Sequence, residues 1–113
     1  MEKTEFEVVE DGTMYNLPTY EVIDGKGIEL TGETLQVKFV RGSKRGDDNV
    51  QKVNGILHET ILAMMIHDLT FKNELVPSEE TNYTLQCLDE ALVSMQKRQS
   101  DREKRQVEGT YAK

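Results

Sequence analysis

The segment that decides the fold is NVQKVNGILHETILAMMIHDLTFKNELVPSEETNYTLQCLDEALVSMQ, residues 49–96. Its apolar residues recur at spacings of three and four, which is the period of one face of a helix. The first run extends from about Asn49 to Lys72 and carries Val53, Leu57, Ile61, Met64 and Phe71, with Leu62, Met65 and Leu69 on a neighbouring stripe. This spacing predicts a long helix with apolar residues on more than one face.

The first helix is expected to end where Asn73 and then Pro77 and Ser78 interrupt the pattern. Ser78 is placed to cap a second helix, because a serine hydroxyl accepts hydrogen bonds from the free N–H groups of a first helical turn. Glu79 and Glu80 come next and favour the positive end of the helix dipole. A turn of five or six residues between two helices predicts an antiparallel hairpin.

The second helix carries an apolar stripe formed by Leu85, Leu88, Leu92 and Met95. We expect this helix to continue through a charged run to about Arg105 and to stop before Gly109. A hairpin buries one stripe of each helix internally, which leaves Leu62, Met64 and Met65 of the first helix on a spare face. This spare face predicts a dimer that packs hairpin against hairpin.

The first forty residues read as short strands separated by turns. The apolar runs are Phe6 to Val9, Met14 to Ile23, Ile28 to Leu30 and Leu35 to Phe39. Two Asp-Gly pairs, at residues 11–12 and 24–25, supply the positive φ angles that tight hairpins need. Pro18 is expected to put its strand at an edge or to break it in two. The pattern predicts a small antiparallel sheet of three or four strands.

Together these segments predict an α+β fold, in which a small N-terminal antiparallel β-sheet precedes a long antiparallel α-helical hairpin. We expect the sheet over residues 1–40, a basic glycine-containing loop (RGSKRGDDN) over residues 41–49, and the hairpin with a basic C-terminal end and tail over residues 50–113. With 113 residues, of which 36% are apolar, the chain can form one compact domain with a modest core.

The charge is unevenly distributed along the chain, whose net charge is −7. Residues 1–40 and 61–96 are acidic, whereas Arg41–Arg45 and Lys97–Arg105 are two short basic stretches. The acidic total argues against binding to duplex nucleic acid. Two focused basic stretches favour a small anionic ligand in a pocket, and the alternative is that they are solvated ends of helices and loops.

Cysteine usage and hydropathy point to a compartment inside the cell. The single cysteine, Cys87, can build neither a disulfide framework nor a cysteine-based zinc site. The sequence has no export signal and no run of ~18 apolar residues, so we expect no membrane association.

Motifs for catalysis and metal binding are incomplete. His58 and Glu59 would need a second histidine at position 62, where Leu62 stands, and His67 falls off the face of His58. The glycines near Arg41 lack the Gly-Lys-Ser/Thr of a phosphate loop. We therefore expect neither an enzyme nor a metal site nor a cofactor.

Three arginines form a candidate phosphate site near the C-terminus. Arg98, Arg102 and Arg105 are spaced by four and three residues, so on a helix they make one ridge of guanidinium groups. Such groups grip phosphate oxygens bidentately. After a glycine hinge, Thr110 and Tyr111 add a hydroxyl and an aromatic face. The alternative is an ordinary cationic helix end, which the helix dipole favours by itself.

The chain also resembles a known family through RGSKRGDDNVQ, GILHETILAMMIHDLTFKNELVPSEET, LDEAL and DREKRQVEGTYAK. These stretches, from Arg41 onward, are similar to the phage-encoded nucleotide sponges of the Thoeris anti-defence type, which are related to anti-CBASS sponges through a shared helical hairpin. The order of sheet and hairpin agrees with that family.

The resemblance implies sequestration without cleavage. Such sponges hold cyclic signalling nucleotides, of the glycocyclic ADP-ribose type or cyclic oligonucleotides, in pockets between protomers in the cytoplasm of the infected bacterium. By this resemblance Phe71 would stack on a base, Arg98 and Arg102 would bind phosphate, and Asn82 would add a polar contact. Arg105, Thr110 and Tyr111 enter the candidate site from the ridge and tail alone.

Two further classes of function remain open from the sequence. The acidic sheet would suit a protein-binding module that docks a host or phage protein, with the basic tail merely solvated. The arginine ridge would suit an accessory RNA-binding role.

Overall fold

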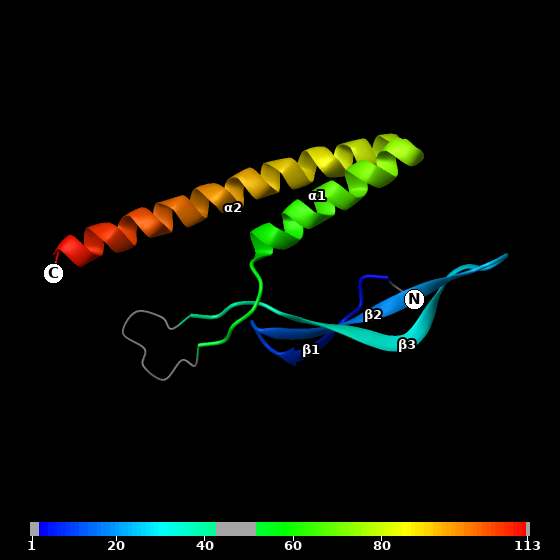
Figure 1. Ribbon diagram of the computed structural model, residues 1–113, viewed down its shortest axis with the longest axis horizontal. Helices are drawn as coiled ribbons and strands as arrows, with labels where there is room; N and C mark the ends of the chain where they lie inside the picture. The colour runs from blue at the N-terminus through cyan, green and yellow to red at the C-terminus, as the bar shows by residue number, and fades with distance from the viewer. Residues whose placement is uncertain (1–2, 43–51, 113) are drawn as a thin grey trace. The chain divides into compact units, whose positions relative to one another are not determined.

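The computed structural model describes residues 3–42 and 52–112, with side chains through residue 104. The chain forms two units, Met1–Leu57 and His58–Lys113. The first contains strands β1 (Glu7–Glu10), β2 (Met14–Ile23) and β3 (Gly27–Lys38), and the second contains helices α1 (His58–Leu75) and α2 (Glu79–Ala112) (Figure 1). The predicted α+β fold, with a sheet before a helical hairpin, is confirmed. Among the described helices none is long and apolar enough to cross a membrane.

The three strands form one antiparallel sheet in the order β1-β2-β3. Both Asp-Gly turns behave as predicted, because Gly12 and Gly25 have φ angles of 78° and 80°. A fourth strand does not form in the described part of the sheet, since Gly32 lies inside the continuous strand β3.

Strand β1 is short and pairs only with the first residues of β2, from Met14 to Asn16. Beyond them β2 and β3 continue as a two-stranded ribbon. Pro18 lies in that part, where β2 has β3 as its one described neighbour, so its missing N–H removes no bond to β1. The strand of Pro18 is thus neither an edge strand nor broken, contrary to the prediction; β2 is the middle strand of the sheet, and only its part around Pro18 has one side without a described neighbour.

A bulge interrupts the ribbon directly after Pro18. Pro18 pairs with Thr34 but Tyr20 pairs with Leu30, so three residues of β3 stand against the single residue Thr19. The Thr19 hydroxyl lies 2.6 Å from the Thr31 hydroxyl and 3.1 Å from the Glu33 carbonyl oxygen, to which it donates. These hydrogen bonds fix the extra residues in place.

The bulge moves the apolar side chains to the other face of the ribbon. Before it, the apolar cross-strand pairs are Tyr15 with Val37 and Leu17 with Leu35; after it, they are Tyr20 with Leu30 and Val22 with Ile28. Because neighbouring residues in a strand point to opposite faces, odd-numbered positions of β2 are apolar before the bulge and even-numbered positions after it. The other face then carries the like-charged pair Glu21 and Glu29.

The segment before α1 corrects the predicted start of the first helix, which is His58 rather than Asn49. Val53 pairs with Arg41 through two backbone hydrogen bonds of 2.8 and 2.9 Å, and Ile56 pairs with Phe39. A Cβ atom on Gly55 would lie 2.6 Å from the carbonyl oxygen of Lys38. Residues 53–56 are therefore held against the end of β3 instead of turning into a helix. Of the basic loop, residues 43–49 lie outside the described ranges.

Helices α1 and α2 run antiparallel (Figure 1). The predicted stripe of α2, Leu85, Leu88, Leu92 and Met95, is half-buried, as are Leu62, Ile66 and Leu69 of α1. Leu62 thus belongs to the hairpin contact and not to the spare face, whereas Met64 and Met65 are exposed as predicted.

The turn between the helices is only three residues long because α1 continues past Asn73 to Leu75. The Ser78 hydroxyl accepts a 3.0 Å hydrogen bond from the Thr81 N–H, which confirms Ser78 as the cap of α2. The Asn73 amide oxygen accepts another from the Ser78 N–H at 3.0 Å. Asn73 therefore fastens the turn from inside the last turn of α1 rather than ending that helix.

Helix α2 has 34 residues and α1 has 18, so α2 extends well beyond the start of α1 (Figure 1). It continues through Ala112, and the expected end before Gly109 is wrong. A single glycine costs a helix only about 1 kcal/mol, which the residues around Gly109 overcome. The described side chains from Gln96 to Lys104 are all exposed.

The described residues include no fully buried apolar side chain, and Thr13 alone is completely enclosed. In the strand unit the ring of Tyr15 meets those of Phe6 and Phe39 edge to face, with ring centroids 5.8 and 5.9 Å apart. Each unit therefore presents apolar surface that its own elements do not cover.

Candidate functional site

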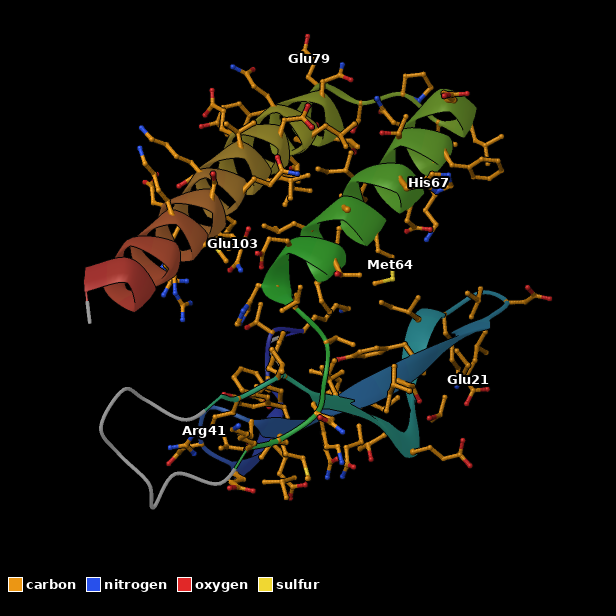
Figure 2. The ribbon with its side chains drawn as sticks, turned by 60° about the vertical axis from the view of Figure 1, so that its left-hand side comes forward. Glu21, Arg41, Met64, His67, Glu79 and Glu103 are labelled. Atoms are coloured by element: carbon orange, nitrogen blue, oxygen red, sulfur yellow. The ribbon has the colours of Figure 1, made fainter. Side chains whose placement is uncertain are left out.

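A shallow hollow of about 400 Å³ lies on one face of α1. Its lining comes from positions spaced by three and four residues, namely Ala63, Ile66, His67, Thr70, Phe71 and Glu74. Such spacing places all six on one side of a helix. His67 and, beside the hollow, Met64 lie on the side of α1 that faces away from α2 (Figure 2).

The hollow combines an apolar floor with three kinds of polar group. Ala63 and Ile66 supply the floor, and the ring of Phe71 is 60% exposed. His67 contributes an imidazole, Thr70 a hydroxyl and Glu74 a carboxylate. An exposed ring bordered by hydrogen-bonding groups can stack on a planar ligand and orient it.

Asn82 lies at the opposite side of the interhelical turn from Asn73. Its amide oxygen accepts a 2.6 Å hydrogen bond from the Asn73 amide nitrogen. This bond ties the first turn of α2 to the last turns of α1 and leaves the Asn82 amide nitrogen as the group that can meet a ligand. Asn82 is therefore part of the turn as well as a candidate contact.

Arg98 and Arg102 lie on the extension of α2 and are exposed. Gln99 donates a 3.2 Å hydrogen bond to Glu103 beside them, which is an ordinary one-turn contact on a helix surface. The backbone of Arg105, Thr110 and Tyr111 is helical, but their side chains lie outside the described part of the chain. The flexible tail expected after residue 109 is wrong, because helix α2 includes it.

Within one chain the candidate residues form two separate groups. Phe71 and Asn82 lie at the turn end of the hairpin, and Arg98 is sixteen residues further along α2 than Asn82. At 1.5 Å per residue this is ~24 Å along one continuous helix. A single chain therefore does not bring Phe71 together with Arg98 and Arg102.

His67, Thr70 and Glu74 were absent from the sequence-based candidates. The signal was their spacing from Phe71, since residues three and four positions away share a helical face with it. That signal is weak in sequence alone, because any exposed helix face carries polar residues at the same spacing.

On α2, Tyr83 and Cys87 lie one turn apart. A hydrogen bond to the Cys87 side chain raises the pKa of the Tyr83 hydroxyl above its ordinary value. Both side chains are exposed. Tyr83 therefore adds a neutral aromatic group to the helix surface beside Asn82.

No family model matches the sequence. Over 86 residues, however, it is 39% identical to a protein of Bacillus phage SBSphiJ7 named Thoeris anti-defense 1. The matched region covers 75% of this chain and 58% of that relative, so the chain spans less than two thirds of the relative's length. Over most of its own length, the chain is therefore similar to a Thoeris anti-defence protein of a Bacillus phage.

Proposed function

We propose that the protein is a phage-encoded sponge that binds cyclic nucleotide immune signals and holds them without cleaving them. The signals are of the glycocyclic ADP-ribose type or are cyclic oligonucleotides, and their removal in the cytoplasm of the infected bacterium blocks Thoeris or CBASS-type defence. The relative's name supports the anti-defence role. The chemistry of the hairpin supports nucleotide binding.

The observation that carries the proposal is the division of the hairpin into a stacking end and a cationic end. Phe71 and Asn82 suit a base, and Arg98 and Arg102 suit phosphate, but Arg98 lies ~24 Å from Asn82 along α2. Two copies packed antiparallel, hairpin against hairpin, would bring the arginines of one copy to the aromatic ring of the other. A twofold dimer would then contain two equivalent sites.

Exposed apolar side chains on α1 support this self-association. Met64, Phe71 and Leu75 are 59%, 60% and 67% exposed, and Met65 is also exposed. Uncovered apolar surface on one helix face is typical of helix partners, and methionine packs adaptably. A second copy would cover this face and enclose the hollow.

A sponge must bind its signal at least as tightly as the immune receptor does. Competing with micromolar to nanomolar receptors takes about 8–12 kcal/mol of binding free energy. Charge-assisted hydrogen bonds at ~1.5–3 kcal/mol each and stacking at ~1–3 kcal/mol per base can supply it in a preformed pocket. Bidentate contacts from Arg98 and Arg102 together with Phe71 meet this requirement.

Ligand recovery tests the proposal directly. The protein is mixed with glycocyclic ADP-ribose, freed of unbound ligand, denatured, and the released molecule is identified by mass. Intact ligand is the expected result. Altered ligand would identify an enzyme instead, and no retention of this or of a cyclic oligonucleotide would overturn the proposal.

Mixed variants test whether the site lies between two copies. Phe71→Ala alone and Arg98→Ala/Arg102→Ala alone should each abolish retention. When the two variants are unfolded together and refolded, half of the dimers contain one of each, and each of those has one intact site. Capacity should return to about one quarter of wild type. No recovery would mean that each site comes from a single chain.

The strand unit favours a second candidate function, a protein-binding module. On the ribbon beyond the bulge, Val22 is 80% exposed, and Glu21 faces Glu29 on the other side. An exposed apolar side chain on one face of the ribbon and acidic side chains on the other suit a basic, partly apolar protein surface. Failure to retain any nucleotide, together with loss of anti-defence activity in Val22→Ser, would favour this candidate.

A further inference from the structure

We propose that Glu74 recognises the ribose of the bound signal, whose base stacks on Phe71. The inference rests on the proposed function and adds to it a residue that selects the sugar. It assigns the hollow on α1 to the nucleoside part of the ligand and leaves the phosphates to the arginines of α2.

The order of groups along α1 fits a nucleoside. Phe71 lies between His67 and Glu74 on one face, four residues after the first and three before the second. With a rise of 1.5 Å per residue, Glu74 is ~4.5 Å further along the helix axis than Phe71. A sugar attached to a base that covers the ring would reach the carboxylate. The hollow of about 400 Å³ also falls within the size range of small-ligand sites.

The charges around the hollow argue for a hydroxyl-bearing group rather than a phosphate at this end. Its lining contains no lysine or arginine. The neighbouring cation is Lys72. Its ammonium nitrogen lies 2.8 Å from the Asp68 carboxylate, with which it forms an ion pair. The Glu74 carboxylate can therefore accept hydrogen bonds but would repel phosphate oxygens.

A carboxylate suits a free hydroxyl of the sugar especially well. Its two oxygens accept two hydrogen bonds at once, and hydrogen bonds to a charged acceptor are the stronger kind. The same pairing of an acidic side chain with ribose hydroxyls is used in dinucleotide-binding folds. Thr70, one helical turn before Glu74, adds a further hydroxyl at the same rim.

The test compares two probes on matched variants by calorimetry: glycocyclic ADP-ribose and its analogue with the free ribose hydroxyls removed. Wild type should bind the first about tenfold more tightly than the second, and Glu74→Ala should bind both with nearly the same affinity. Glu90→Gln, an exposed carboxylate on α2 outside the hollow, is the control and should keep the wild-type preference.

The outcomes separate this inference from the proposed function. If wild type binds neither probe nor a cyclic oligonucleotide, the sponge itself is wrong. If wild type binds but Glu74→Ala keeps the same preference between the probes, or weakens both probes equally, Glu74 does not read the ribose and the inference is overturned. Circular dichroism shows whether the variant is folded, and Glu74→Gln, which keeps the side-chain shape, should show an intermediate preference.

Discussion

The two units of the chain are both built on a hairpin with a paired part and an extension, but the extensions differ in kind. In the strand unit β2 and β3 continue beyond β1 as a ribbon with exposed apolar side chains such as Val22. In the helical unit α2 continues beyond α1 with exposed charged and polar side chains from Gln96 to Lys104. One extension carries apolar surface into water and the other carries charge.

The two extensions therefore differ in what they need in order to be stable in water. A two-stranded ribbon gains little stability by itself and needs cover for its apolar side chains. An isolated helical extension is also marginal, but its cations are already compatible with water and remain free to meet an anion. We therefore expect the two units to respond to different substitutions.

The largest effect is expected from Gly55→Ala in the strand unit. The new Cβ would lie 2.6 Å from the Lys38 carbonyl oxygen, so the segment must move away from β3. We expect a loss of about 2–3 kcal/mol, measured by urea denaturation. Amide exchange should speed up in residues 38–42 and 52–56 and stay unchanged in α1 and α2. Gly42→Ala, where the space is open, is the control and should be neutral. Faster amide exchange in the helices would mean that the substitution also destabilises the helical unit and that the two units do not respond separately.

Leu88→Ala should act on the helical unit alone. Leu88 is half-buried in the stripe that packs against α1, so its truncation removes part of the hairpin contact. Partial burial reduces the usual cost of this substitution to about 2 kcal/mol. Val93→Ala on the same helix, at a side chain that is 65% exposed, should cost much less. Equal costs at the two positions would mean that the hairpin packs through a different face.

Ser78→Ala tests the turn that joins the two helices. The hydroxyl caps α2 through the Thr81 N–H, and its loss should lower stability by about 1 kcal/mol. Thermal melting of the helical signal would measure it, with Ser94→Ala in the helix interior as the matched control. If Ser94→Ala lowered stability as much as Ser78→Ala does, the effect at Ser78 could not be attributed to the cap.

The smallest effect is expected from Asp68→Asn. The Lys72 and Asp68 side chains are 66% and 54% exposed, and such surface pairs contribute about 0.3–0.5 kcal/mol. The difference from wild type should vanish in 1 M salt, where screening removes what the pair contributes. A loss above 1 kcal/mol that survives high salt would mean that Asp68 is covered by another copy.

Much of the fold could be predicted from local signals. The Asp-Gly turns and the cap at Ser78 each depend on a residue and its immediate neighbours, and the structure agrees with both. The apolar stripe of α2 was equally local, because its period alone identifies the buried face.

The start of α1 could not be predicted in this way. Val53, Leu57 and Ile61 happen to follow a helical period, so the pattern extended the helix eight or nine residues too far. The start of α1 is set instead by the pairing of Val53 with Arg41 and by the close packing of Gly55 on the end of β3. Neither contact can be recognised in a short stretch of sequence. Leu62 was assigned to the wrong face for a related reason, since two neighbouring stripes on one helix differ only by which of them α2 covers.

The candidate site residues stay a prediction. Spacing pointed to Arg98 and Arg102 and the family resemblance to Phe71, whereas the ~24 Å between Asn82 and Arg98 follows only from one unbroken helix. The helical state of Gly109 was missed because glycine is a weak stop signal that its surroundings can override.

Because the helix is unbroken between Asn82 and Arg98, the number of residues in this segment sets both the distance to the arginines and the side of the helix on which they lie. Each inserted or deleted residue shifts everything beyond it by 1.5 Å and rotates it by ~100° about the axis, so a change of one or two residues turns the arginines to a different side. A change of seven restores the direction within ~20° but displaces the arginines by ~10.5 Å. Related proteins that use both ends should therefore vary freely in the side chains of this segment and hardly at all in its number of residues.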